Sequence, residues 1–260
     1  YKALYSATTI GQNTAIGGLA AEYVTGSGNT ALGYKAHNGV SGSTTGSYNV
    51  VIGEKASENA TTMYSSTIVG YRAGRAITTG ANNVAVGIYA GDALTTATDC
   101  VFLGRDAGGG VTTGNYNTAI GAESMMGAVT GTANVVVGRD GLRAITSGAY
   151  NVALGNDTNR SCTDGDNNVA IGHKTLFASN ASDNVGVGFN ALMANTSGIN
   201  NVAAGTNALL AVTSGGNNVA LGHAAGDSVT TGSHNISLGR NAGSALSTTH
   251  WSIFIGADSG

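Results

Sequence analysis

Short stretches in which aliphatic and small residues alternate recur along the whole chain. In Asn151-Val-Ala-Leu-Gly155 the second and fourth residues are aliphatic and the middle one is small. Alternation of this kind with β-branched residues predicts a short strand that buries one face. Five-residue stretches of this kind occur fifteen times, nearly always with an apolar second and fourth residue and usually with a small residue between them. All end in Gly, and they start at Asn13, Asn29, Asn49, Ser66, Asn83, Cys100, Asn117, Asn134, Asn151, Asn168, Asn184, Asn201, Asn218, Asn235 and Ser252.

The spacing of these copies is nearly constant. From Ser66 to Ser252 the step is the same throughout, except that one step is a single residue shorter, and only the step from Asn29 to Asn49 is clearly longer. A fixed period of this length indicates a solenoid or a fibrous array rather than a compact enzyme. We therefore predict an all-β fold, a parallel β-solenoid or β-roll of about fifteen 17-residue coils, with residues 1–260 forming a single repeat array.

The rest of each unit is also regular. The invariant Gly indicates either a positive φ or a neighbouring chain too close for a Cβ. An Ala often follows three residues later, an aliphatic residue four residues after that, and then a turn such as Thr112-Thr113-Gly114. Each unit is thus expected to be a strand, a Gly turn, a second short extended piece and a second turn. Stacked copies of the Asn would hydrogen-bond from coil to coil as an amide ladder.

Composition supports this prediction and narrows the partners. There are 42 glycines, no proline and only 10% charged residues, where globular proteins carry about 25%. The net charge of −3 comes without a basic block, so nucleic acid is not an expected partner. No apolar run approaches the ~20 residues that span a bilayer, which argues against membrane insertion. Cys100 and Cys162 lie more than three repeats apart and are expected to be small buried side chains rather than a disulfide.

The small size of the apolar residues favours association. A coil filled mainly with Ala and Val offers little apolar surface to offset the entropy lost when its residues are ordered. Burial of a second face against other copies of the chain would make up the difference. We therefore expect a homo-oligomer.

Two families share these motifs. The stretches Asn151-Val-Ala-Leu-Gly155 and Asn13-Thr-Ala-Ile-Gly17 resemble the head repeats of trimeric autotransporter adhesins, which form a trimer of parallel β-rolls. The fuller unit, Gly188-Phe-Asn-Ala-Leu192-Met-Ala-Asn-Thr-Ser-Gly198-Ile-Asn-Asn201-Val, is similar to the repeats of bacteriophage tail fibres and related surface fibres. The resemblance covers nearly the whole chain. It implies a homotrimeric fibre that lies outside the cell, in a virion tail fibre or on a cell surface.

The function expected from these observations is structural. The chain would be a fibre shaft used in host or surface attachment, most simply a segment of a phage tail fibre, and copies could also assemble end to end. The first alternative is a bacterial surface adhesin or extracellular filament subunit, and the second is an ice-binding β-solenoid. Histidines and cysteines show no ligand or nucleophile spacing, so the sequence indicates neither an enzyme nor a cofactor.

At the position two residues after each Gly, residues of the same charge occur on several successive coils. In a stacked fold its four successive carboxylates would stand about 5 Å apart and repel one another unless something compensates them. One interpretation is a divalent-cation site or an acidic groove. The interpretation we favour is a solvated column of carboxylates, whose mutual repulsion is reduced by Arg105, Arg139 and Arg143. The four carboxylates are Asp106, Glu123, Asp140 and Asp157.

The column directly after each Gly holds larger and more varied residues. Variety within a strict repeat marks an outward face, and an aromatic and basic stripe is a candidate site for a cell-surface glycan or receptor. The alternative is ordinary exposed surface. The candidate residues are Tyr34, Tyr71, Arg105, Arg139, His173, Phe189, His223 and Arg240.

A threonine column and two irregular regions complete the candidates. The column would present a flat hydroxyl array for ice, although Asp164 and Ala181 interrupt it. The coils near residues 37–66 are irregular, with a surface bulge expected at 39–43. The aromatic stretch within 249–260 is a candidate junction to a neighbouring module. The threonine column includes Thr79, Thr96, Thr113, Thr130 and Thr231.

Overall fold

The computed structural model describes residues 2–5, 11–40, 44–245 and 247–260, and it is an all-β parallel solenoid in which each sequence repeat forms one turn. This confirms the predicted fold class. Contacts divide the chain into two compact units, Tyr1–Ala133 and Asn134–Gly260. The strands of the first unit are β1 (Thr14–Ile16), β2 (Thr30–Leu32), β3 (Val50–Ile52), β4 (Thr67–Val69), β5 (Val84–Val86), β6 (Val101–Leu103) and β7 (Thr118–Ile120). Those of the second are β8 (Val135–Val137), β9 (Val152–Leu154), β10 (Val169–Ile171), β11 (Val185–Val187), β12 (Val202–Ala204), β13 (Val219–Leu221), β14 (Ile236–Leu238) and β15 (Ile253–Ile255).

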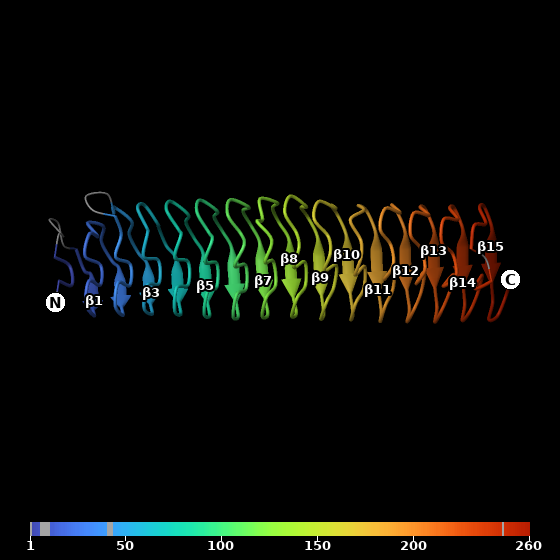
Figure 1. Ribbon diagram of the computed structural model, residues 1–260, viewed down its shortest axis with the longest axis horizontal. Helices are drawn as coiled ribbons and strands as arrows, with labels where there is room; N and C mark the ends of the chain where they lie inside the picture. Colours follow the sequence, from blue (N-terminus) through green and yellow to red (C-terminus); the bar gives the residue numbers. More distant parts are fainter. Residues whose placement is uncertain (1, 6–10, 41–43, 246) are drawn as a thin grey trace. The chain divides into compact units, whose positions relative to one another are not determined.

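Within each unit the strands stack side by side in chain order (Figure 1). Every neighbouring pair is parallel and in register with the sequence repeat, so that Ala153 of β9 lies beside Ala170 of β10. The same registration pairs Ala85 of β5 with Phe102 of β6. Each unit therefore places equivalent side chains in columns.

The middle residue of each strand turns inward, and the two residues that flank it turn outward. Ala153 is fully buried, whereas Val152 and Leu154 are half-buried. This arrangement holds in all strands, with a partly exposed middle residue only in β1 and β15. The β-branched residues that make the strand recognisable thus form its outer face, and the small residue between them faces the core.

The second segment of each coil is not the extended piece that the sequence suggested. Within the described residues it is a series of turns, with only three isolated bridges outside the strands. The reason lies in the backbone: two residues per coil, such as Asp157 (φ 54°) and Asn159 (φ 46°), adopt the left-handed conformation. A chain that alternates in this way curls back on itself instead of extending.

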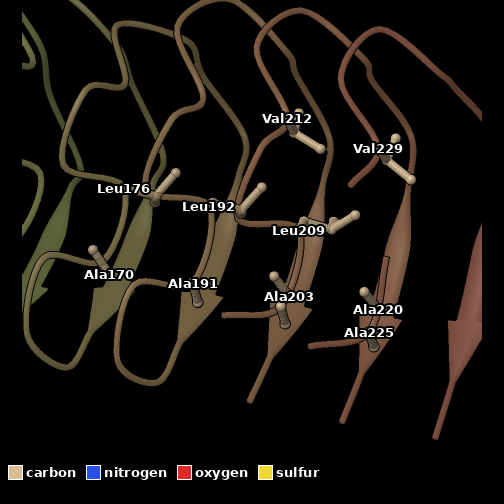
Figure 2. Close-up of a cluster of buried hydrophobic side chains, with 11 residues drawn as sticks. Ala170, Leu176, Ala191, Leu192, Ala203, Leu209, Val212, Ala220, Ala225 and Val229 are labelled. Atoms are coloured by element: carbon tan, nitrogen blue, oxygen red, sulfur yellow. The ribbon is translucent and has the colours of Figure 1, made fainter. Parts of the chain in front are cut away.

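The core lies between the strands and this series of turns (Figure 2). The strands contribute small side chains such as Ala170, Ala203 and Ala220, all fully buried. Larger aliphatic chains come from the turns, among them Leu192 and Leu209. Each coil therefore has a strand wall and a turn wall whose inner side chains meet.

The repeated Asn and Gly each have a structural role. The Asn forms the predicted amide ladder: buried Asn168 donates from Nδ2 to Oδ1 of Asn151 at 3.0 Å and to the carbonyl of Ala181 at 2.8 Å. Gly155 has a φ of +128°, and a Cβ there would lie 2.0 Å from the carbonyl oxygen of Gly172 in the next coil. Both reasons proposed for the invariant Gly are thus confirmed.

The cysteines, the bulge and the C-terminal stretch were also singled out by the sequence. Cys100 and Cys162 are free and buried, as predicted. The bulge expected at 39–43 falls partly on residues 41–43, which lie outside the described residues. In the C-terminal stretch the ring of Trp251 stacks on His234 at 3.9 Å between centroids and is 76% exposed. No helix in the described ranges is long and apolar enough to cross a membrane.

Candidate functional site

The outward side of the strands carries an apolar stripe in each unit. We call the first and third residues of every strand the outer stripe. The third residue is apolar in all strands, and the first is Val or Ile except where it is Thr. Nearly every coil has a large apolar residue at the position of Leu221, and yet the position is at least partly exposed, with Leu221 itself 43% exposed. The exposed large members are Ile16, Leu32, Val50, Val86, Leu103, Val135, Val137, Ile171, Val187, Leu221, Ile253 and Ile255.

The outer stripe has the size of an interaction surface. Strands of three residues are about 10 Å long and lie about 4.8 Å apart, so β8–β15 alone cover on the order of 300 Å². Apolar patches of about 300–600 Å² are the largest on typical monomers and are often functional. The outer stripe is therefore the principal candidate surface for association.

The carboxylate column of the first unit is compensated by arginine. Arg105 donates to Asp106 at 2.6 Å through Nη1 and to Glu123 through Nη2. Hydrogen bonding to Glu123, followed by its charge, raises the pKa of the Arg105 guanidinium. The left-handed backbone at Asp106 (φ 56°) and Glu123 (φ 61°) turns the two carboxylates toward that guanidinium.

The carboxylates of the second unit are compensated in the same way. Burial of Asp140 would by itself raise the pKa of its carboxyl, but hydrogen bonds from Arg139 and Arg143 lower it below its usual range. Asp157 is paired with Arg160 at 3.6 Å, a partner that the sequence did not suggest. Within the ranges that the structure describes, no three His, Cys, Asp or Glu side chains are grouped to hold a metal ion. Arginine thus contacts all four carboxylates, but the column is not solvated throughout, since Asp140 is buried.

The candidate ligand column after each Gly lies on the surface of both units but is not a continuous stripe. None of its eight residues is buried. Glu54 and Ile88 occupy the coils on either side of Tyr71, so they separate it from the other candidates. Only His173 and Phe189 stack directly, with centroids 5.5 Å apart and ring planes 9° apart. The remaining candidates are Tyr34, Arg105, Arg139, His223 and Arg240, all exposed.

The threonine column is a surface feature. Thr79, Thr96, Thr113 and Thr130 are exposed on consecutive coils of the first unit. The neighbouring threonines, one residue earlier, support the fold instead, since hydroxyls such as that of Thr95 donate to the carbonyl of Thr112 at 3.0 Å. In the second unit Asp164 is exposed in the column and Ala181 is buried, so the array is interrupted there.

A surface cavity of about 270 Å³ was not anticipated from the sequence. It is lined by Tyr89, Asp92, Asp106, Gly109 and Met126, all in the first unit. The only signal in the sequence was the Gly itself. Five residues after the repeat Gly, the adjacent coils place Asp92 and Met126, whereas this coil has Gly109.

Comparison with known proteins identifies no relative of this chain. No protein-family model matches it, no curated protein matches it, and no solved structure matches it.

Proposed function

We propose that this chain is a shaft segment of an attachment fibre in which copies pack through their outer stripes as a homotrimer. One observation carries the proposal: the outer stripe repeats in every coil and remains exposed in the single chain. A repeat under no packing constraint would be expected to vary at these positions, as the column after each Gly does.

The rest of the surface supports a mechanical role. The carboxylates of the charged column are paired with arginines, and the free cysteines are buried. Within each unit, successive coils are joined by parallel backbone hydrogen bonds and by the Asn ladder. A stack of this kind transmits force along its columns, because each repeat contacts its neighbours through the same set of bonds. The proposal therefore assigns the chain no catalytic role and no cofactor.

We propose that the shaft lies outside the cell as part of a virion, which is what the resemblance to tail-fibre repeats implies. A bacterial surface adhesin or filament would use the same trimer and would differ in the surface to which it is attached. Both versions predict the same assembly in solution, so the assembly is the property to test first.

Multi-angle light scattering of the full chain tests the trimer. One chain has a mass of 25.6 kDa, and a trimer has three times that mass. Replacing Val187 of the outer stripe with Asp should release monomers, because three carboxylates would be buried in an apolar interface. Met193→Asp, on the half-buried turn wall, is the matched control and should leave the mass unchanged. A wild-type mass equal to that of one chain, with native circular dichroism, would refute the trimer.

The ice-binding alternative depends on the exposed threonines of the first unit. Four on consecutive coils are fewer than a continuous array along the chain would provide, and the interruption in the second unit removes the regular spacing. We expect no thermal hysteresis in a dilute solution of the full chain. Hysteresis that disappears in Thr96→Val and Thr113→Val variants would favour ice binding over the shaft function.

A further inference from the structure

The cavity beside Gly109 exists because one side chain of the repeat is missing. At the position five residues after the repeat Gly, Asp92 and Met126 extend from the neighbouring coils and Gly109 lies between them. The cavity volume of about 270 Å³ is at the lower end of the roughly 300–1,000 Å³ typical of ligand sites. It fits a ligand of one or two small rings better than a polymer segment.

The two carboxylates that line the cavity already have cationic partners. Asp92 is paired with Arg75 at 3.2 Å, and Asp106 is paired with Arg105 at 2.6 Å. Arg75 also donates from Nη2 to the other oxygen of Asp92 at 3.4 Å. A carboxylate has about four lone-pair positions, and these arginine contacts use only part of them. The carboxylates can therefore accept further hydrogen bonds, while their charge is largely compensated. This combination favours hydroxyl donors over a cationic ligand.

The other walls are apolar and held in place. The ring of Tyr89 packs edge-on against that of Tyr71, with centroids 5.5 Å apart and planes at 79°. Tyr89 has a left-handed backbone (φ 58°), and it lines the cavity. Met126 closes the other side with a polarizable thioether. An aromatic ring and a thioether in one lining suit the C–H face of a sugar ring.

We propose that this cavity binds a neutral saccharide, with Tyr89 and Met126 against the apolar face of the ring and Asp92 and Asp106 accepting its hydroxyl protons. The inference goes beyond the shaft function, since a single chain carries the complete cavity. It also differs from the ligand column expected after each Gly, of which no member lines the cavity.

The cavity stays accessible when the outer stripe is covered. In the same coil the ring of Phe102 points inward from the strand and lies against Gly108 of the turn wall. A Cβ on the next residue, Gly109, would instead meet the carbonyl oxygen of Asp106 and Sδ of Met126, neither of which belongs to a strand. A trimer packed through its outer stripes would therefore carry a saccharide site on its exposed surface.

Saturation-transfer NMR on the full chain provides the test. The probes are glucose, galactose, mannose and N-acetylglucosamine, singly and as disaccharides. Gly109→Met should fill the cavity with the side chain that the repeat uses in the next coil, and Asp106→Asn should remove one acceptor at a left-handed position that Asn tolerates. Each should weaken binding of the active sugar about tenfold or more.

Matched controls use the same columns of the second unit. Ser244→Met is the counterpart of Gly109→Met. Asp258→Asn removes a carboxylate from a residue whose backbone is also left-handed (φ 54°) and whose side chain is paired with an arginine. Both should leave saccharide binding unchanged. Absence of any saccharide signal, or a signal that both cavity variants retain, would overturn the proposal. The proposal would also be overturned if no sugar binds but calcium or spermidine does, and if the cavity variants abolish that cation binding. A saccharide-binding monomer would refute the trimer and leave this inference standing.

Discussion

The ring of Phe102 occupies the space that a side chain at position 108 would need. A Cβ on Gly108 would lie 2.3 Å from Cδ1 of Phe102, and Gly108 has a φ of +61°. The converse arrangement occurs where the strand residue is small, as at Ala203, whose coil places Leu209 at the position of Gly108. In these two coils the large side chain thus comes from opposite walls, whereas Ala220 and Gly226 are both small in another coil.

This relationship predicts the effect of filling the position. Gly108→Ala should lower the free energy of unfolding by about 2–4 kcal/mol, because it combines overpacking with a left-handed non-Gly backbone. Urea unfolding followed by circular dichroism measures the change. The control is Gly226→Ala, which has nearly the same φ (+59°) but whose nearest Cβ contact would be the flexible end of Leu209, at 3.0 Å.

The control should lose only about 1–2 kcal/mol, the cost of the left-handed backbone. Equal losses in the two variants would show that the Phe102 ring gives way without cost. A double variant, Phe102→Ala with Gly108→Leu, should recover stability relative to Phe102→Ala alone, because it copies the Ala203–Leu209 arrangement.

Cys100 interrupts the amide ladder, and restoring the Asn should stabilise the fold. Its thiol lies 3.4 Å from the carbonyl of Gly114, a contact that the Asn of other coils makes as a normal hydrogen bond. Cys100→Asn should raise the free energy of unfolding by about 1 kcal/mol. The reciprocal variant, Asn151→Ala, should lower it by about 1–3 kcal/mol, because buried partners lose their bonds. Destabilisation by Cys100→Asn would indicate that the ladder has no room for the amide.

Acid should weaken the fold through His37. Its imidazole is fully buried without a hydrogen-bond partner, and burial lowers its pKa from 6.5 to about 4. Between these two values the unfolded chain binds a proton that the folded chain excludes. The free energy of unfolding should therefore fall by about 1.4 kcal/mol per pH unit from pH 6.5 to pH 4 on account of this residue, while above pH 6.5 its contribution is constant.

Urea unfolding at several pH values checks this prediction. Other coils have Leu at the repeat position of His37, as at Leu142 and Leu176. His37→Leu should therefore be tolerated and should flatten the acid side of the stability profile. The control variant His223→Leu removes an exposed histidine and should retain the steep fall. An unchanged slope in His37→Leu would assign the acid sensitivity to other groups.

The candidate site was only partly predictable. The sequence indicated that arginines compensate the charges of Asp106 and Asp140. These arginines lie one to three positions away along the chain, and residues so close within one turn remain close in space. The cavity did not, since it is formed by Asp92, Gly109 and Met126 from three successive coils. Its volume depends on how neighbouring side chains pack, which the sequence order alone does not specify.

The constant period, together with the strand-like alternation within each repeat, determined that the chain forms a parallel solenoid, because stacked coils place like residues beside one another. The amide ladder and the close approach at Gly155 followed from the same stacking. Tertiary structure alone decided which side of each strand is buried. Both sides of a stretch such as Val152-Ala-Leu154 are apolar, and the choice depends on the narrow space between the strand wall and the turn wall. That space admits the small Ala153 and leaves the larger aliphatic chains outside, where they form the outer stripe. The large Phe102 enters the same space opposite Gly108.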